Sequence, residues 1–455
     1  MLRLSRGLLT GAVALAMLVL PGVAQAQSIV GALTSAYVNS PSLMSALLSV
    51  KSAAENIVLA KAGTRPTIGL SLDGTTSVAV FAGVDGSQKS QNLSLNLSYR
   101  QTLFDNFQTD AKVEQARAMV EVSTYALANE EQNVLLSVVQ AYVGVVRDQA
   151  LVRLRQENVE FFDAQVSSAQ ERLRIGEGTR IDVSQAEARR AQAVAAYRAA
   201  IADLTLSQAS FERWVGSKPG NLKLEFPYAR LLPQSIDQAI ELATTRHPAV
   251  LTARAAIRAA QAGSDEARAA FGPTLDLIGS VCAINCAGGG STIGMSGSIR
   301  LTLAVPLYAG GALGASVRKA NLEQIKSEVD ALDTRDQIRE AVVSAWTSLQ
   351  NATAQIESAQ SGVESGQLVL QGIIQERDVG QRTTLDVLNA QAELTSAREG
   401  QIQANAGRII ASFALIAATG GLNATNLGLK VEIKSAQGYV ATVEDIWQEL
   451  RSIDE

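Results

Sequence analysis

The two halves of this 455-residue chain repeat one another, and this duplication limits the folds that the chain can adopt. One set of residues recurs 207 positions later: Pro41, Ala46, Ala53, Ala60 and Pro66 match Pro248, Ala253, Ala260, Ala267 and Pro273. A second set recurs 204 positions later: Leu103, Gly176, Thr179, Asp182, Val183 and Ala186 match Leu307, Gly380, Thr383, Asp386, Val387 and Ala390. Fixed offsets predict two copies of one unit, at about 33–216 and 240–420, with a linker at 217–239 and a C-terminal tail at 421–455.

The N-terminus has the three parts of a secretory signal. Arg3 and Arg6 precede an apolar run at residues 8–20, and the small-residue sequence Ala24-Gln25-Ala26 follows. A membrane anchor is the alternative, but the run is shorter than the roughly 20 residues of a spanning helix. The pattern predicts a signal peptide at residues 1–26 and export of the rest of the chain.

Each half contains two segments with the period of a β-strand. Apolar residues alternate with other residues over 93–99 in the first half and 299–307 in the second. Shorter segments of the same kind lie upstream, at 68–72 and 275–277. Because alternation places one kind of side chain on each face of a strand, we expect one hairpin in each half and four strands in the chain.

Long segments without proline follow the strands. All nine Pro residues lie at or before Pro306, and aromatic residues make up only 4% of the chain. Apolar side chains recur every three or four positions, as at Leu135, Val138 and Tyr142. This spacing predicts helices, and one helix over residues 106–175 would be about 100 Å long.

Rods of this length favour antiparallel coiled-coil packing over a compact domain. Tight turns between paired helices are expected at residues 176–178 and 380–382, where glycine can end a helix.

Four strands cannot close a barrel, and open strand edges are not tolerated in lipid because their backbone groups would be unpaired. An exported chain of this kind must combine its strands with those of other copies. Two copies would supply about eight strands, a barrel that side chains nearly fill, whereas three would supply about twelve. The chain is therefore expected to form a homotrimer.

Other classes of protein find little support. No nucleotide-binding loop, hydrolase turn or cluster of metal ligands appears, so neither an enzyme nor a cofactor is expected. The single histidine, His247, precedes the repeated Pro248 and is expected to lie at a helix start. A net charge of −5 gives no case for nucleic acid. A structural coiled-coil protein would explain the helices but not the strands.

The duplicated unit resembles the TolC-like outer-membrane efflux and secretion proteins over nearly all of the mature chain. The motifs that carry the resemblance are Leu103-Phe104-Asp105, Pro306-Leu307-Tyr308-Ala309-Gly310-Gly311, and the paired turns of pattern Gly-x-x-Thr-x-x-Asp-Val at Gly176 and Gly380. The resemblance implies a homotrimer with a twelve-stranded barrel in the lipids of the outer membrane and a helical tunnel in the periplasm. It also implies a periplasmic adaptor and an inner-membrane exporter as partners.

The segment from Phe211-Glu-Arg-Trp214 to Leu232-Pro233 resembles the branch of that family that serves type I protein secretion. This implies an ATP-driven exporter as the pump. Efflux of small molecules with a proton-driven pump is the alternative.

The resemblance also implies which residues meet the adaptor. The turns between the long helices lie farthest from the strands and are expected to be the docking tips. Their residues are Ile175, Gly176 and Glu177 in the first half, and Val379, Gly380 and Gln381 in the second.

A periplasmic gate is expected beside the second tip. Asp386 matches an acidic ring of the family, in which three carboxylates would repel one another, raise their pKa and attract cations. Asn389 replaces a second acid of that ring. Arg382 matches a residue that restrains the closed entrance, and Asp182 is its expected partner. The alternative is that Asp182 and Asp386 only cap helices with Thr179 and Thr383.

Cys282 and Cys286 are the only cysteines, and they fall between the expected strands of the second hairpin. In an exported chain, such a pair predicts a disulfide in an extracellular loop. A metal site is less expected, because no further ligand is close in sequence.

Overall fold

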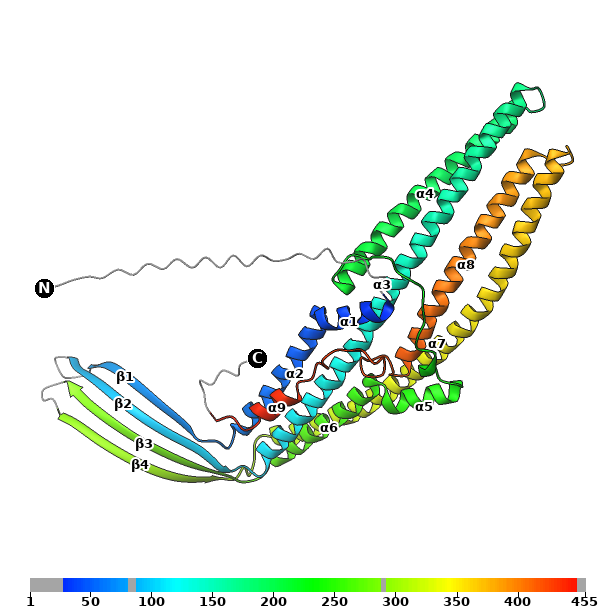
Figure 1. Ribbon diagram of the computed structural model, residues 1–455. Coiled ribbons are helices and arrows are strands. Elements are labelled where there is room, and N and C mark those ends of the chain that lie inside the picture. Colours follow the sequence, from blue (N-terminus) through cyan, green and yellow to red (C-terminus); the bar gives the residue numbers. More distant parts are fainter. Residues whose placement is uncertain (1–27, 81–86, 288–291, 448–455) are drawn as a thin grey trace, which may run out of the picture.

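The computed structural model describes residues 28–80, 87–287 and 292–447, and shows an elongated molecule with a β-sheet at one end and two helical hairpins at the other (Figure 1). The expected signal peptide lies outside the described residues. The chain begins with α1 (Ile29–Asn39) and α2 (Pro41–Lys61), followed by the hairpin β1 (Thr67–Val80) and β2 (Ser87–Phe104). The long helices α3 (Gln108–Arg174) and α4 (Arg180–Val215) complete the first half.

The second half repeats this order. After the short helix η1 (Ala229–Leu231) come α5 (Ile236–Arg246) and α6 (Pro248–Ala269), then β3 (Thr274–Ala287) and β4 (Thr292–Ala304). The long helices α7 (Ala312–Asp378) and α8 (Thr384–Ala418) follow, and α9 (Gln437–Val443) lies in the C-terminal segment. The predicted hairpins and long helices are thus confirmed, and α3 and α7 each have 67 residues.

The four strands form one antiparallel sheet in the order β1-β2-β3-β4. In register, Ile68 lies opposite Tyr99, Tyr99 opposite Gly279, and Gly279 opposite Ile299. Residues opposite one another in this way form a row across the sheet, and the side chains of every second row project from the same face. The face that includes this row carries most of the apolar residues of the strands. They include Ile68, Leu70, Leu72, Leu93, Leu95, Leu97, Leu275, Leu277, Leu301 and Leu303. The other face carries mainly polar residues.

The two halves turn from strand to helix through the same backbone geometry. Gly310 and Gly311 have positive φ angles of 62° and 84°, which glycine adopts without steric cost. In the first half, Asn106 and Phe107 take the same conformation, with φ of 56° and 65°. Asn106 is held there by a hydrogen bond of 3.0 Å from its Nδ2 to the carbonyl oxygen of Ala269.

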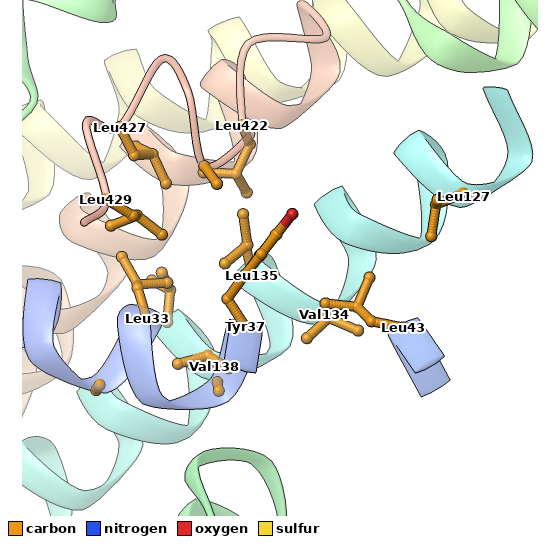
Figure 2. Packing of buried hydrophobic residues seen from close by; sticks show 14 of the residues in the cluster. Leu33, Tyr37, Leu43, Leu127, Val134, Leu135, Val138, Leu422, Leu427 and Leu429 are labelled. Atoms are coloured by element: carbon orange, nitrogen blue, oxygen red, sulfur yellow. The ribbon is translucent and has the colours of Figure 1, made fainter. Parts of the chain in front are cut away.

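The main hydrophobic core lies between the sheet and the hairpins. Figure 2 shows Leu33 and Tyr37 of α1 packed against Leu135 and Val138 of α3. The segment after α8 closes this core from the other side, through Leu422, Leu427 and Leu429. The apolar stretches of α2 and α3 are long enough to cross a membrane by length and composition, but both contribute side chains to this core.

Candidate functional site

The two turns between the long helices form the tips of the molecule, at the end opposite the sheet (Figure 1). Gly176 and Gly380 have φ of 84° and 80°, the left-handed conformation that ends a helix. The following amides donate back into the helix: Glu177 N lies 2.9 Å from Arg172 O, and Gln381 N lies 2.8 Å from Glu376 O. These bonds hold the turns in the same shape in both halves.

Apolar side chains at the tips point into solvent. Ile175 is 56% exposed and Val379 is 71% exposed, although both stand beside ordered turns. No side chain or backbone atom lies within 4 Å of the position that a Cβ would take at Gly176 or Gly380. The tips are thus free of packing partners within the described chain.

Both helices that return from the tips begin with a capping box. Thr179 Oγ1 accepts from the backbone amide of Asp182 at 3.2 Å, and Thr383 Oγ1 accepts from that of Asp386 at 3.3 Å. Each carboxylate in turn accepts from the threonine amide, at 3.0 and 2.9 Å. The capping alternative is therefore realised within one chain for both acids.

The pKa of Asp386 is lowered within one chain. The hydrogen bonds from the amide and hydroxyl of Thr383 stabilise its ionised form, and Arg382 adds a smaller favourable charge. A raised pKa is expected only where the Asp386 carboxylates of three copies come together. Their mutual repulsion would have to outweigh the hydrogen bonds from Thr383.

Arg382 does not contact Asp182 in the described chain. Its Nε donates to Glu376 Oε2 at 2.8 Å, across the turn of its own hairpin. The expected pairing of Arg382 with Asp182 is therefore not formed within one chain, and it stays a prediction for the trimer. Glu376 satisfies the guanidinium locally, and no sequence motif marked this residue.

Asn389 joins the two hairpins. Its Oδ1 accepts from Arg189 Nη2 of α4 at 2.9 Å. Farther from the tips, Gln391 Nε2 and Thr395 Oγ1 both donate to Asn158 Oδ1 of α3, at 3.1 Å each. These three residues are at least 91% buried, so their bonds are shielded from water. Nothing in the sequence pattern indicated this buried polar link between α3 and α8.

An ion pair and a partly buried hydrogen bond add to this contact nearer the tips. Arg172 of α3 lies 3.3 Å from Asp378 of α7, and Arg377 Nη1 donates to Gln165 Oε1 at 2.9 Å. The two hairpins of one chain are thus connected at several levels, from the buried polar link to the tips.

The cysteines do not form the expected disulfide. Both lie within β3 and not in a loop, and Cys282 is a free cysteine. Four residues of extended strand separate their Cα atoms by about 13 Å, whereas a disulfide requires less than about 7 Å. The prediction failed because the strand continues beyond the segment whose alternation was apparent.

His247 lies where it was expected, at the start of α6. Its Nδ1 accepts from the amide of Ala249 at 3.1 Å, and burial lowers the pKa of the imidazole. Within the described residues, no group of three or more His, Cys, Asp or Glu side chains could hold a metal ion.

Known proteins are similar to this chain in both sequence and fold. A family model described as outer membrane efflux protein matches residues 32–217 and 239–421. The outer membrane efflux protein BepC of Brucella suis biovar 1 is 37% identical, over 98% of this chain and 97% of its own. The alkaline protease secretion protein AprF of Pseudomonas aeruginosa is 26% identical, over 66% of this chain and 64% of its own.

A crystal structure of CusC has the same fold. It superposes with a TM-score of 0.76 at 19% identity, and the match covers 86% of this chain and 92% of that one. Together with the duplicated sequence, the sheet and the paired hairpins, these matches show that the chain belongs to the outer membrane efflux protein family, the TolC-like channels of the outer membrane.

Proposed function

We propose that three copies of the chain assemble into one export channel, with their sheets joined in a twelve-stranded barrel and their helices in a periplasmic tunnel. The observation that carries this proposal is the four-stranded sheet, which has one apolar face and two edge strands, β1 and β4. Lipid can solvate the apolar face but not the unpaired backbone groups of the edges. Pairing β1 of one copy with β4 of the next would satisfy both edges.

The tips are the proposed docking site for a periplasmic adaptor. Ile175 and Val379 expose apolar side chains there, and the tips lie at the greatest distance from the sheet (Figure 1). Gly176 and Gly380 follow them, and the open space around these glycines leaves each turn accessible to a partner. An inner-membrane exporter would then supply the energy, and the channel itself would catalyse no reaction.

Asp386 is the proposed acidic ring of the entrance. It is partly exposed, its pKa is lowered by its hydrogen bonds from Thr383, and it lies in the first turn of α8 next to the tip. Three such carboxylates around a threefold axis would attract cations. Asn389 contributes no charge to this ring, and its bond to Arg189 gives it a structural role between the hairpins.

Two kinds of cargo fit the proposal. The segment at residues 211–233 and the similarity to AprF, which is named for protease secretion, favour protein export through a type I system. The similarity to BepC, which is named as an efflux protein, favours small molecules. We place protein export first, because the resemblance in that segment belongs to the secretion branch.

Native cells that lack this protein distinguish between the two kinds of cargo. If the cargo is protein, secreted proteins should disappear from the medium of these cells and return when the protein is restored. The accumulation of a fluorescent dye in the cells should then stay unchanged. For efflux, dye accumulation should rise and the secreted proteins should stay constant. If neither changes, the proposed export function is wrong.

A further inference from the structure

Two arginines lie at the same level of the sheet and project from its polar face. Arg100 of β2 is the register partner of Ile278 of β3, and Ile278 is in turn the partner of Arg300 of β4. Residues paired in this way share a face of the sheet. The row of Arg100, Ile278 and Arg300 is next to the row of Tyr99, Gly279 and Ile299, which lies on the apolar face. Because successive residues of a strand point to opposite faces, both guanidinium groups lie on the polar face.

The two guanidinium groups are available to bind a ligand. Both side chains are exposed, and among the described residues neither has a hydrogen-bond or ion-pair partner within its chain. The one carboxylate in the adjacent row, Asp276, accepts instead from Thr102 Oγ1 at 2.9 Å. The row on the other side is uncharged, with Ser280 and Ser298 hydrogen-bonded to each other at 2.8 Å.

The spacing suits one anion between the two arginines. Only β3 separates their strands, so their Cα atoms are about 10 Å apart at roughly 4.8 Å per strand. Long side chains from both can converge above Ile278, which offers no competing polar group. Guanidinium groups bind phosphate and carboxylate through paired hydrogen bonds, and two of them surround such a group better than one.

We propose that Arg100 and Arg300 form an anion-binding band inside the barrel, which selects for anionic groups, such as phosphates and carboxylates, on the molecules that pass. This inference rests on the proposed trimeric channel, in which the polar face of the sheet lines the lumen. Threefold symmetry then places three copies of each arginine around the axis. Asp386, beside the tips, is negative, so the channel carries negative charge at the tips and positive charge where the strands approach the helices.

Single-channel recording in planar bilayers tests the band, with inorganic pyrophosphate as the anionic probe. Pyrophosphate added on the barrel side should reduce the current through the native channel. In the double variant R100Q/R300Q, the concentration for half-block should rise by about tenfold, as expected when charge-assisted hydrogen bonds are lost. The double variant R100K/R300K keeps the charge, so pyrophosphate should half-block it at a concentration between those for the native channel and for R100Q/R300Q.

A matched control removes Lys89, a basic residue that lies on β2 like Arg100 but on the apolar face of the sheet. Lys89 of β2 pairs with Val78 and follows the alternation of Leu93 and Leu95, so K89Q should leave the block unchanged. Trimers that conduct but show equal block in native and R100Q/R300Q channels would overturn the anion-binding band alone. A chain that forms no conducting trimer would overturn the proposed channel as well.

Discussion

Arg382 and Glu376 form an ion pair of 2.8 Å between the two ends of the turn at the second tip. Glu376 lies near the end of α7, and Arg382 lies just before α8 begins. The pair therefore braces the turn that carries Val379 and Gly380, next to Asp386 of the proposed acidic ring.

The first prediction separates this brace from a restraint between hairpins. If Arg382 acts only through Glu376, then Arg382→Ala and Glu376→Ala should change the open probability of single channels equally. The double variant should add nothing, because both substitutions remove the same ion pair. Asp182→Ala is the matched control, and it should leave the open probability unchanged. An effect of Arg382→Ala that Asp182→Ala reproduces would instead support a link between Arg382 and Asp182 in the trimer.

The second prediction concerns the buried polar link between α3 and α8. Replacing Asn158 by Ala removes the acceptor of Gln391 Nε2 in a dry contact, whereas Thr395 Oγ1 still donates to Gln391 O at 2.9 Å. An unsatisfied buried N–H costs roughly 1–3 kcal/mol, so the variant should unfold at clearly lower temperature. The triple variant Asn158→Leu, Gln391→Leu, Thr395→Val removes donors and acceptor together and should recover part of the loss. Thermal unfolding of the detergent-solubilised protein measures both, and an unchanged midpoint for Asn158→Ala would contradict the role of the link.

The third prediction concerns acid. Burial lowers the pKa of His247 in the folded chain, so the unfolded chain binds more protons at mildly acidic pH. Stability from the neutral imidazole is therefore present above its unfolded pKa, roughly 6.5, and is lost as the pH falls through the lower pKa of the folded state. Protonation also removes the acceptor for the amide of Ala249, a helix cap worth about 1 kcal/mol.

His247→Ser supplies the control, since Ser40 is the N-cap at the matching position of the first half. Between pH 7.5 and 5, the unfolding midpoint of this variant should fall less than that of the native protein. Equal slopes of midpoint against pH would assign the acid sensitivity to other groups.

The fourth prediction compares three glycines with positive φ. Gly176 and Gly380 have open space around the missing side chain, whereas a Cβ at Gly420 would lie 2.8 Å from the Cα of His247. Gly420→Ala should therefore reduce the yield of folded protein, because backbone has to move. Gly176→Leu and Gly380→Leu should leave the folded protein in the outer membrane and abolish export. Normal export from the tip variants would remove the tips as the docking site.

Local patterns predicted the elements of this fold because each is set by nearby residues. Alternation at 93–99 and 299–307 located β2 and β4, and the repeated Thr-x-x-Asp sequences located the starts of α4 and α8. The end of β3 was missed, since its last residues, from Val281 to Ala287, mix small, polar and apolar types without a clear period. The disulfide prediction failed for this reason.

Contacts between distant segments could not be predicted in the same way. The bond between Asn158 and Gln391 joins residues 233 positions apart, and Asn and Gln in long helices look like ordinary surface residues. The segment after α8 likewise has no period that reveals its packing against α1 and α3. The resemblance identified Arg382 but not the nearby carboxylate of Glu376, which pairs with it within one chain.

Unitary current through the purified protein is the decisive test of the trimeric channel, since the proposed function requires a conducting trimer. The protein should insert into planar bilayers as trimers that conduct in discrete steps. A trivalent cation added on the side of the tips should block these steps in the native channel, and Asp386→Ala should relieve the block. Trimers that insert stably without conducting would contradict the account, and equal block in the two proteins would leave Asp386 only its role as a helix cap.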